Sequence, residues 1–197
     1  MGKRPEHDIK LLTPLQPFTH TMKTAHIKVQ LDPGATMPTR AHATDVGYDV
    51  TCAKFYIKHT DGAEEYCTTI EQVRRAIMNY RRFICEDDTY LVIIDTGVHV
   101  QPEPGYYVEL VPNSRQSKTS IRWGNSIGVI DPTYTGSIKI ILHNIAFANP
   151  GDLANYLPGK VVGQLIVRPY LSADFEQVDS LAPTERGEGG FGSTANK

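Results

Sequence analysis

The sequence predicts a mainly β domain, a distorted jelly roll or β-barrel-like fold with one short inserted α-helix and a flexible C-terminal arm. Short stretches of alternating apolar and polar residues recur along the chain, and Gly or Pro separates them. One segment, residues 69–83, instead repeats apolar residues at intervals of three and four. With 197 residues, of which 40% are hydrophobic, the chain is large enough for one domain with a buried core.

The predicted strands follow from this alternation and from β-branched and aromatic residues. In chain order they are residues 27–31, 48–52, 90–100, 106–111, 127–130, 137–142 and 161–169. We interpret Gly97 as a bulge inside one long strand, 90–100. Turns are expected where Gly and Pro cluster, at 32–34, 104–105 and 132–136.

The helix is expected over residues 69–83, where Ile70, Val73, Ile77 and Tyr80 share one face and Thr68 or Thr69 provides a cap. Four arginines lie on this segment. Because acidic residues flank it on both sides, they indicate a solvated helix face rather than a nucleic-acid patch.

The amino-acid composition argues against several classes of function. The net charge is −2, and no basic stripe predicts nucleic-acid binding. No apolar run approaches a membrane span. The three cysteines form no CxxC pair, which favours an intracellular location (cytoplasm, with the nucleus open) and argues against a zinc site. The expected organisation is an N-terminal extension at 1–24, a β domain at 25–175 with a helical insertion at about 58–88, and a C-terminal arm at 176–197.

The arm combines several glycines with side chains that suit a ligand with phosphate groups and a flat ring. Arg186 supplies a guanidinium for a phosphate and Phe191 a ring that can cover a base. Gly192 and Ser193 add backbone N–H groups and a hydroxyl. The alternative is a disordered Gly-rich tail.

Four further clusters fall at strand ends, where binding residues often lie on β scaffolds. Asp49 ends a turn that holds a second aspartate and could orient metal-bound water. Residues 112–120 carry hydroxyls and cations suited to phosphate. Asp131 follows an apolar run, as a general base at a strand end does, and Gln164 follows a Gly inside a strand. Taken singly, each is also consistent with an ordinary polar turn.

In this order, the clusters resemble the five motifs of the trimeric dUTPase family. The matches are 43–50, then 128–131 with Tyr134 and Gly136, then 158–159 leading to 163–165, then 186–194. They span about residue 25 to the C-terminus. The second motif departs from the pattern, because Asn113 stands where the family usually has arginine before Ser114.

The resemblance implies hydrolysis of dUTP to dUMP and pyrophosphate with Mg²⁺ on the phosphates. It assigns Asp131 as the base that activates water and Asp49 as a contact to the water shell of Mg²⁺. It places the remaining site residues around dUTP: Ser114, Arg115, Asn125, Gly128, Tyr134, Gln164, Arg186, Phe191, Gly192 and Ser193. Arg115 can replace the missing arginine only if its segment is turned rather than extended.

The family resemblance also implies a homotrimer with shared active sites. Two alternatives stay open. A dCTP deaminase shares the fold, but Ile141 stands where that reaction needs a glutamate. A regulatory or structural protein on the same fold would tolerate the altered second motif.

Overall fold

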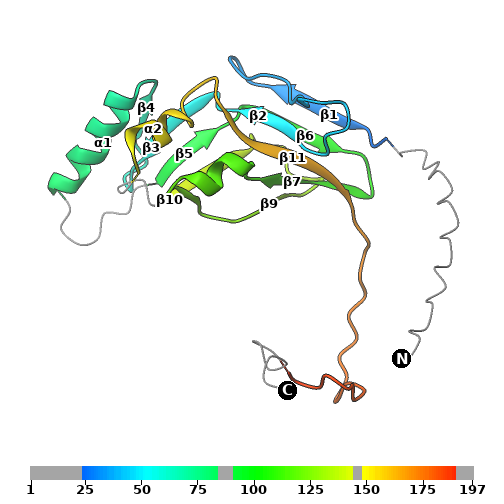
Figure 1. Ribbon diagram of the computed structural model, residues 1–197. Helices are drawn as coiled ribbons and strands as arrows, with labels where there is room; N and C mark the ends of the chain where they lie inside the picture. Colours follow the sequence, from blue (N-terminus) through cyan, green and yellow to red (C-terminus); the bar gives the residue numbers. More distant parts are fainter. Residues whose placement is uncertain (1–23, 84–90, 144–147, 190–197) are drawn as a thin grey trace, which may run out of the picture.

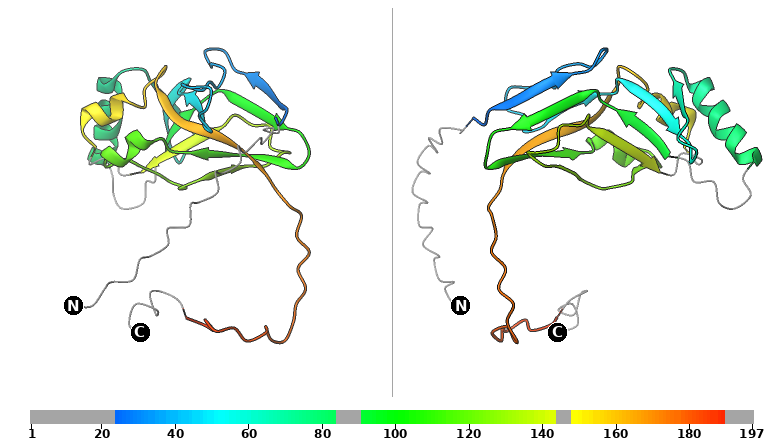
Figure 2. Two further views of the ribbon diagram at one scale, coloured as in Figure 1. Left: turned by 45° about the vertical axis from the view of Figure 1, so that its right-hand side comes forward. Right: turned by 180° about the vertical axis from the view of Figure 1, so that it is seen from behind.

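The computed structural model describes residues 24–83, 91–143 and 148–189. Their strands form three antiparallel sheets, stacked into a flattened body from which the C-terminal segment leads away (Figure 1). Figure 2 shows the same layering turned by 45° and from behind. The mainly β, jelly-roll-like prediction is confirmed.

The first sheet pairs β1 (Ile27–Leu31) with β6 (Val98–Pro102). The second, of five strands, has the order β4-β3-β5-β10-β8. Its members are β3 (Lys54–Lys58), β4 (Glu64–Cys67), β5 (Leu91–Asp95), β8 (Arg122–Trp123) and β10 (Lys139–His143).

The third sheet positions most of the predicted site residues. It has the order β2-β11-β7-β9, formed by β2 (Tyr48–Thr51), β7 (Tyr106–Val111), β9 (Gly128–Ile130) and β11 (Val161–Pro169). Because β11 lies between β2 and β7, it joins segments that are more than fifty residues apart in sequence.

The prediction of one strand over 90–100 is wrong. The chain turns at Thr96 and Gly97, so β5 belongs to the five-stranded sheet and β6 to the two-stranded sheet. Gly97 has φ +64°, and a Cβ there would lie 2.8 Å from the Cβ of Ala35. Only glycine fits this positive φ and this close approach, so the residue changes the sheet instead of making a bulge within one.

The expected helix is present as α1 (Ile70–Phe83). Gln72 accepts hydrogen bonds from the backbone N–H groups of Thr68 (2.7 Å) and Thr69 (3.0 Å), and its own N–H donates to the Thr69 hydroxyl (3.3 Å). This reciprocal cap begins the helix. Val73 and Ala76 are fully buried, so α1 packs its apolar face beside β4 and α2 at one end of the body (Figure 1).

Sequence analysis missed the short elements β3, β4, β8, α2 (Pro150–Ala154) and the 3₁₀ helix η1 (Ser114–Lys118). Predicted edges also shift, since β9 begins at Gly128 and β10 at Lys139. The core between the sheets is made of aliphatic and aromatic side chains, including Val50, Phe55, Ile57, Ile94, Leu110, Ile121, Ile138 and Ile140. In the described residues, no helix is both long and apolar enough to cross a membrane.

Candidate functional site

Asp49 and Gln164 form a pair across the β2–β11 ladder, where they lie directly opposite each other. The Gln164 amide Nε2 donates to Asp49 Oδ1 at 2.9 Å. Gly47 makes room for this pair, because a Cβ there would lie 2.8 Å from Gln164 Oε1. The two residues predicted separately for metal-bound water and for phosphate therefore form one half-buried polar unit.

The segment after β7 is turned, not extended. Asn113 precedes η1, and its Oδ1 accepts from the backbone N–H of Arg115 at 3.1 Å. The Ser117 hydroxyl donates to the Ser114 carbonyl at 2.7 Å. Ser114 and Arg115 are both exposed on this turn. Asn113 thus caps a 3₁₀ turn, so the segment that carries Ser114 and Arg115 is turned, and the role of Arg115 stays a prediction.

Gly163, predicted to admit a close approach, is approached by an indole ring. A Cβ at Gly163 would lie 2.6 Å from Cη2 of Trp123 and 3.0 Å from the Val111 carbonyl oxygen. The register of β11 also shifts between Val161 and Gly163. Glycine therefore lets β8 pack against β11 immediately next to Gln164.

Asp131 follows β9 and is exposed at the start of a turn. Its carbonyl accepts from the Tyr134 N–H at 3.0 Å. The Tyr134 hydroxyl donates to the Ser137 carbonyl at 3.1 Å, which folds the ring back over Gly136. The Tyr134 side chain still leaves 45% of its surface exposed. The turn therefore presents a carboxylate and a ring whose hydroxyl end is fixed.

Asn125 lies in the loop between β8 and β9, two strands of different sheets, and Gly128 is the first residue of β9, which leads into this turn. A Cβ at Gly128 would lie 3.3 Å from the Leu110 Cβ and 3.6 Å from Asn125 Nδ2. A side chain at this position would therefore press against Leu110 and be in ordinary contact with the Asn125 amide. Asn125 itself is exposed. This loop exposes an amide, a group that can hydrogen-bond to a base edge, whereas Gly128 behind it is buried.

Asp131 and Ser114 lie toward opposite ends of β7, whereas Gly128 pairs with Leu110, next to the partner of Gln164. Ile130, next to Asp131, pairs with Val108, whereas Gln164 pairs with Val111. At about 3.3 Å per residue, these two positions are about 10 Å apart along β7. Asp131 lies beyond the first position and Ser114 beyond the second, so the predicted base and the predicted phosphate residues are separated along β7 within one chain.

The arm is a third separate group. Residues 171–188 are exposed and lead away from the body after β11 (Figure 1). Arg186 is exposed and its Nε donates to the Gly189 carbonyl at 2.9 Å, so it contacts neither of the other groups. The predicted residues Phe191, Gly192 and Ser193 lie outside the described residues.

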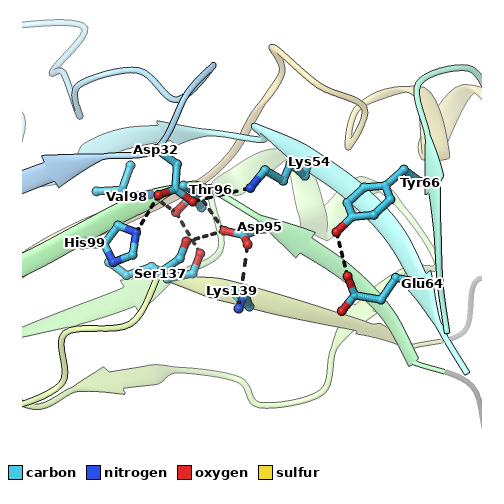
Figure 3. A network of polar contacts seen from close by, with 12 residues as sticks. Asp32, Lys54, Glu64, Tyr66, Asp95, Thr96, Val98, His99, Ser137 and Lys139 are labelled. Carbon is cyan, nitrogen blue, oxygen red and sulfur yellow. Dashed lines mark hydrogen bonds and ion pairs between the residues drawn. The ribbon is translucent and has the colours of Figure 1, made fainter. Parts of the chain in front are cut away.

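A buried polar network behind the Asp131 turn was missed by sequence reasoning (Figure 3). Asp95, with its side chain only 8% exposed, accepts from the Ser137 hydroxyl and from the Gly97 N–H at 2.9 Å. Lys139 Nζ lies 3.8 Å from the other oxygen of this carboxylate. The network links the β5–β6 corner to the end of the turn.

His99 on β6 extends this network to the turn itself. Its Nδ1 lies 2.8 Å from the Thr135 carbonyl oxygen and its Nε2 3.1 Å from Asp32 Oδ1. The bond to Thr135 raises the pKa of His99 most, burial opposes this, and Asp32 adds to the rise. No local pattern predicts these contacts, because 67 and 36 residues separate the partners.

The described residues contain no group of three or more His, Cys, Asp or Glu side chains that could hold a metal ion. Asp49 is a single half-buried carboxylate with one oxygen engaged by Gln164. This donor set fits a hydrated Mg²⁺ that a ligand's phosphates bind, since Mg²⁺ keeps several waters and needs few carboxylates.

The dUTPase family model matches residues 76–195, which is more than half of the chain. The protein therefore belongs to the dUTPase family. The deoxyuridine 5'-triphosphate nucleotidohydrolase of Aeromonas salmonicida (strain A449) is 33% identical over 124 residues, covering 62% of this chain and 78% of the relative. That of Escherichia phage T5 is 40% identical over 107 residues, covering 54% and 70%.

Solved structures support the same fold. A mutant dUTPase of Staphylococcus bacteriophage 80alpha, solved with dUpNHpp, superposes with a TM-score of 0.58 at 23% identity, covering 87% of this chain and 99% of that one. A mutant dUTPase from phage phi11 of S. aureus, described with a structural Mg(II) ion, gives 0.54 at 24% identity, covering 80% and 99%. At these identities the likeness shows the fold alone.

Proposed function

We propose that this protein hydrolyses dUTP to dUMP and pyrophosphate. Membership of the dUTPase family supports the reaction. The observation that carries the assignment is the Asp131–Tyr134 turn, which places an exposed carboxylate beside a ring fixed through its hydroxyl. A dCTP deaminase would need a carboxylate at Ile141, and none stands there.

Asp131 acts as the general base in this proposal. Its carboxylate orients a water toward the α-phosphorus and takes up its proton as the water attacks. Tyr134 packs under the deoxyribose, which leaves no room for a ribose hydroxyl. Asn125 and the backbone near Gly128 bind the uracil edge. The tight segment between β8 and β9 excludes the thymine methyl group.

Ser114, Arg115 and Gln164 hold the phosphates. The 3₁₀ turn supports this role, because it exposes the Ser114 hydroxyl and the Arg115 guanidinium together. Asp49 would hold the water shell of a Mg²⁺ ion, which would supply neutralising charge on the phosphates. Arg186 then pairs with the γ-phosphate, while Phe191, Gly192 and Ser193 close over the nucleotide as a lid.

We further propose that the active site is shared between copies in a homotrimer. The opposite placement of Asp131 and Ser114 along β7 supports this, as does the arm that leads away from its own body. One copy would supply the segment that runs from Asn125 to Tyr134. A second copy would supply Ser114, Arg115 and Gln164, and the third would supply the arm.

The activity is tested by Mg²⁺-dependent release of pyrophosphate from dUTP, compared with dCTP, dTTP and UTP. Selective turnover of dUTP is expected. Equal turnover of UTP would remove the role given to Tyr134, and no turnover of any nucleotide would favour the regulatory alternative.

Sharing is tested by mixing two inactive variants, Asp131→Asn and Gln164→Ala, unfolded and refolded together. In random trimers, about a quarter of the shared sites receive an intact copy of each residue, so part of the activity should return. Each variant refolded alone is the control. If the mixture stays as inactive as its parts, the residues serve a site within one chain.

A further inference from the structure

His99 faces two groups that only accept hydrogen bonds. Its Nδ1 lies 2.8 Å from the Thr135 carbonyl, and its Nε2 lies 3.1 Å from an oxygen of the Asp32 carboxylate. A neutral imidazole carries one N–H and would leave a lone pair pointing at one of these oxygens. The imidazolium donates to both. The geometry therefore fits the charged form of His99.

The charges around His99 agree with this. Asp32 and Asp95 are the acidic groups that act on it, and both raise its pKa. Lys54 Nζ lies 3.5 Å from Asp32, and Lys139 Nζ lies 3.8 Å from Asp95. Each lysine is thus paired with a carboxylate instead of facing the imidazole directly (Figure 3).

The three partners lie on parts of the chain that sequence does not connect. Asp32 follows β1, His99 is in β6, and Thr135 is in the turn after β9. Asp32 is itself fixed, because its backbone N–H donates to the Gly97 carbonyl at 2.8 Å. His99 therefore ties the turn to a rigid corner between two sheets.

We propose that His99, as an imidazolium bridging Asp32 and the Thr135 carbonyl, is a positioning residue for the turn that carries Asp131 and Tyr134. Its catalytic consequence rests on the proposed function of those two residues. Thr135 is the residue after Tyr134, so the bridge fixes the backbone that sets both the carboxylate and the ring.

The bridge makes the turn sensitive to pH. The folded-state pKa of His99 lies above its ordinary value of about 6.5. The stabilisation is therefore fully present below that ordinary value and is lost as pH rises through the folded-state pKa. The bridge then keeps one hydrogen bond and loses the charge attraction, and the turn loosens on the alkaline side.

The first test is an NMR titration of the full chain, with His99 assigned by comparison with His99→Gln. The expected result is a pKa above that of a free histidine, with the amide signals of residues 131–136 shifting at the same midpoint. Asp32→Asn should lower the midpoint. A midpoint at or below the free value, or turn amides that do not follow it, overturns the bridge.

The second test measures kcat and KM for dUTP between pH 6 and 9. His99→Gln should lower kcat on the order of tenfold at pH 6.5, the size of a lost charge-assisted hydrogen bond. The difference from the unaltered protein should shrink as pH rises. His26→Gln, at an exposed histidine outside the bridge, is the control and should match the unaltered protein.

A constant loss at every pH would mean that His99 only supports folding, and it would overturn the positioning role. If the unaltered protein does not hydrolyse dUTP, the proposed function fails. The NMR titration still decides in that case whether the bridge holds the turn.

Discussion

The turns that follow β7 and β9 are held in different ways. The turn that carries Asp131 has one local bond, from the Tyr134 hydroxyl to the Ser137 carbonyl, and is held from outside by His99 and by the buried Asp95 carboxylate. In η1 and at its ends, hydrogen bonds join residues two to five apart, such as Asn113 to Arg115, and Thr119 has one long-range bond, to Tyr156. The turn that carries Asp131 is therefore held largely by distant elements, whereas the turn that carries Ser114 and Arg115 is held mostly by bonds between near neighbours in sequence.

This difference indicates which of the two turns, the one after β7 or the one after β9, can change its residues more easily. A turn built from local bonds can change its residues without disturbing the sheets. This is where the chain departs from its family, with Asn113 in the place of arginine. The turn after β9, joined to three other elements, keeps the family pattern at Asp131, Tyr134 and Gly136.

The largest expected effect is at the base. Asp131→Asn keeps the shape of the side chain and removes the proton acceptor, so kcat should fall about 10²–10⁴-fold while dUTP still binds. Single-turnover kinetics and calorimetric binding of a non-hydrolysable dUTP analogue measure the two parts. Near-normal turnover would remove Asp131 from the mechanism.

The next largest effect is expected at Arg115 in η1, the turn proposed to bind phosphate. Arg115→Ala should cost about 2–4 kcal/mol of transition-state stabilisation, the scale of losing one preorganised donor. Lys118→Ala, in the same 3₁₀ turn, is the matched control and should cost little. The measurement is kcat/KM for dUTP. Equal losses for the two variants would mean that the turn supplies general positive charge and that Arg115 has no special place.

A smaller effect is expected at the long-range contact that holds the turn carrying Asp131, the hydrogen bond from Ser137 to Asp95. Ser137→Ala removes a hydrogen bond to the buried Asp95 carboxylate and should lower the free energy of unfolding by about 1.5–3 kcal/mol. Urea denaturation measures it, with the exposed Ser126→Ala as control. A loss no greater than that of the control would show that the Gly97 N–H and Lys139 suffice for Asp95.

The smallest effect tests the local support of η1. Asn113→Ala removes the cap and should cost about 0.5–2 kcal/mol, whereas Asn113→Ser keeps a capping oxygen and should cost less. Hydrogen exchange should show the change confined to residues 113–119. If protection also falls in the Asp131 turn, the two turns are coupled and the contrast between them is wrong.

Local patterns predicted α1, because Ile70, Val73 and Ile77 set the helical period and the Thr69–Gln72 cap sets its start. They also predicted most strands of the β2-β11-β7-β9 sheet. They failed at 90–100, because a β-prone run does not say which neighbours its two halves pair with. The change of sheet at Gly97 is decided by contact with Ala35, sixty-two residues earlier in the chain.

By itself, the sequence determined which chemical groups this protein has and their order: the hydroxyl and cation proposed to bind phosphate, the proposed base, the ring and the arm. Residue type and short-range spacing carry that information, since each motif lies within a few consecutive residues. Tertiary structure alone decided that Gln164 donates to Asp49, that Ser114 and Asp131 lie at opposite ends of β7, and that His99 holds the Thr135 carbonyl. These are pairings between distant segments, and sheet register, buried volume and hydrogen-bond satisfaction fix them only once the whole chain has packed.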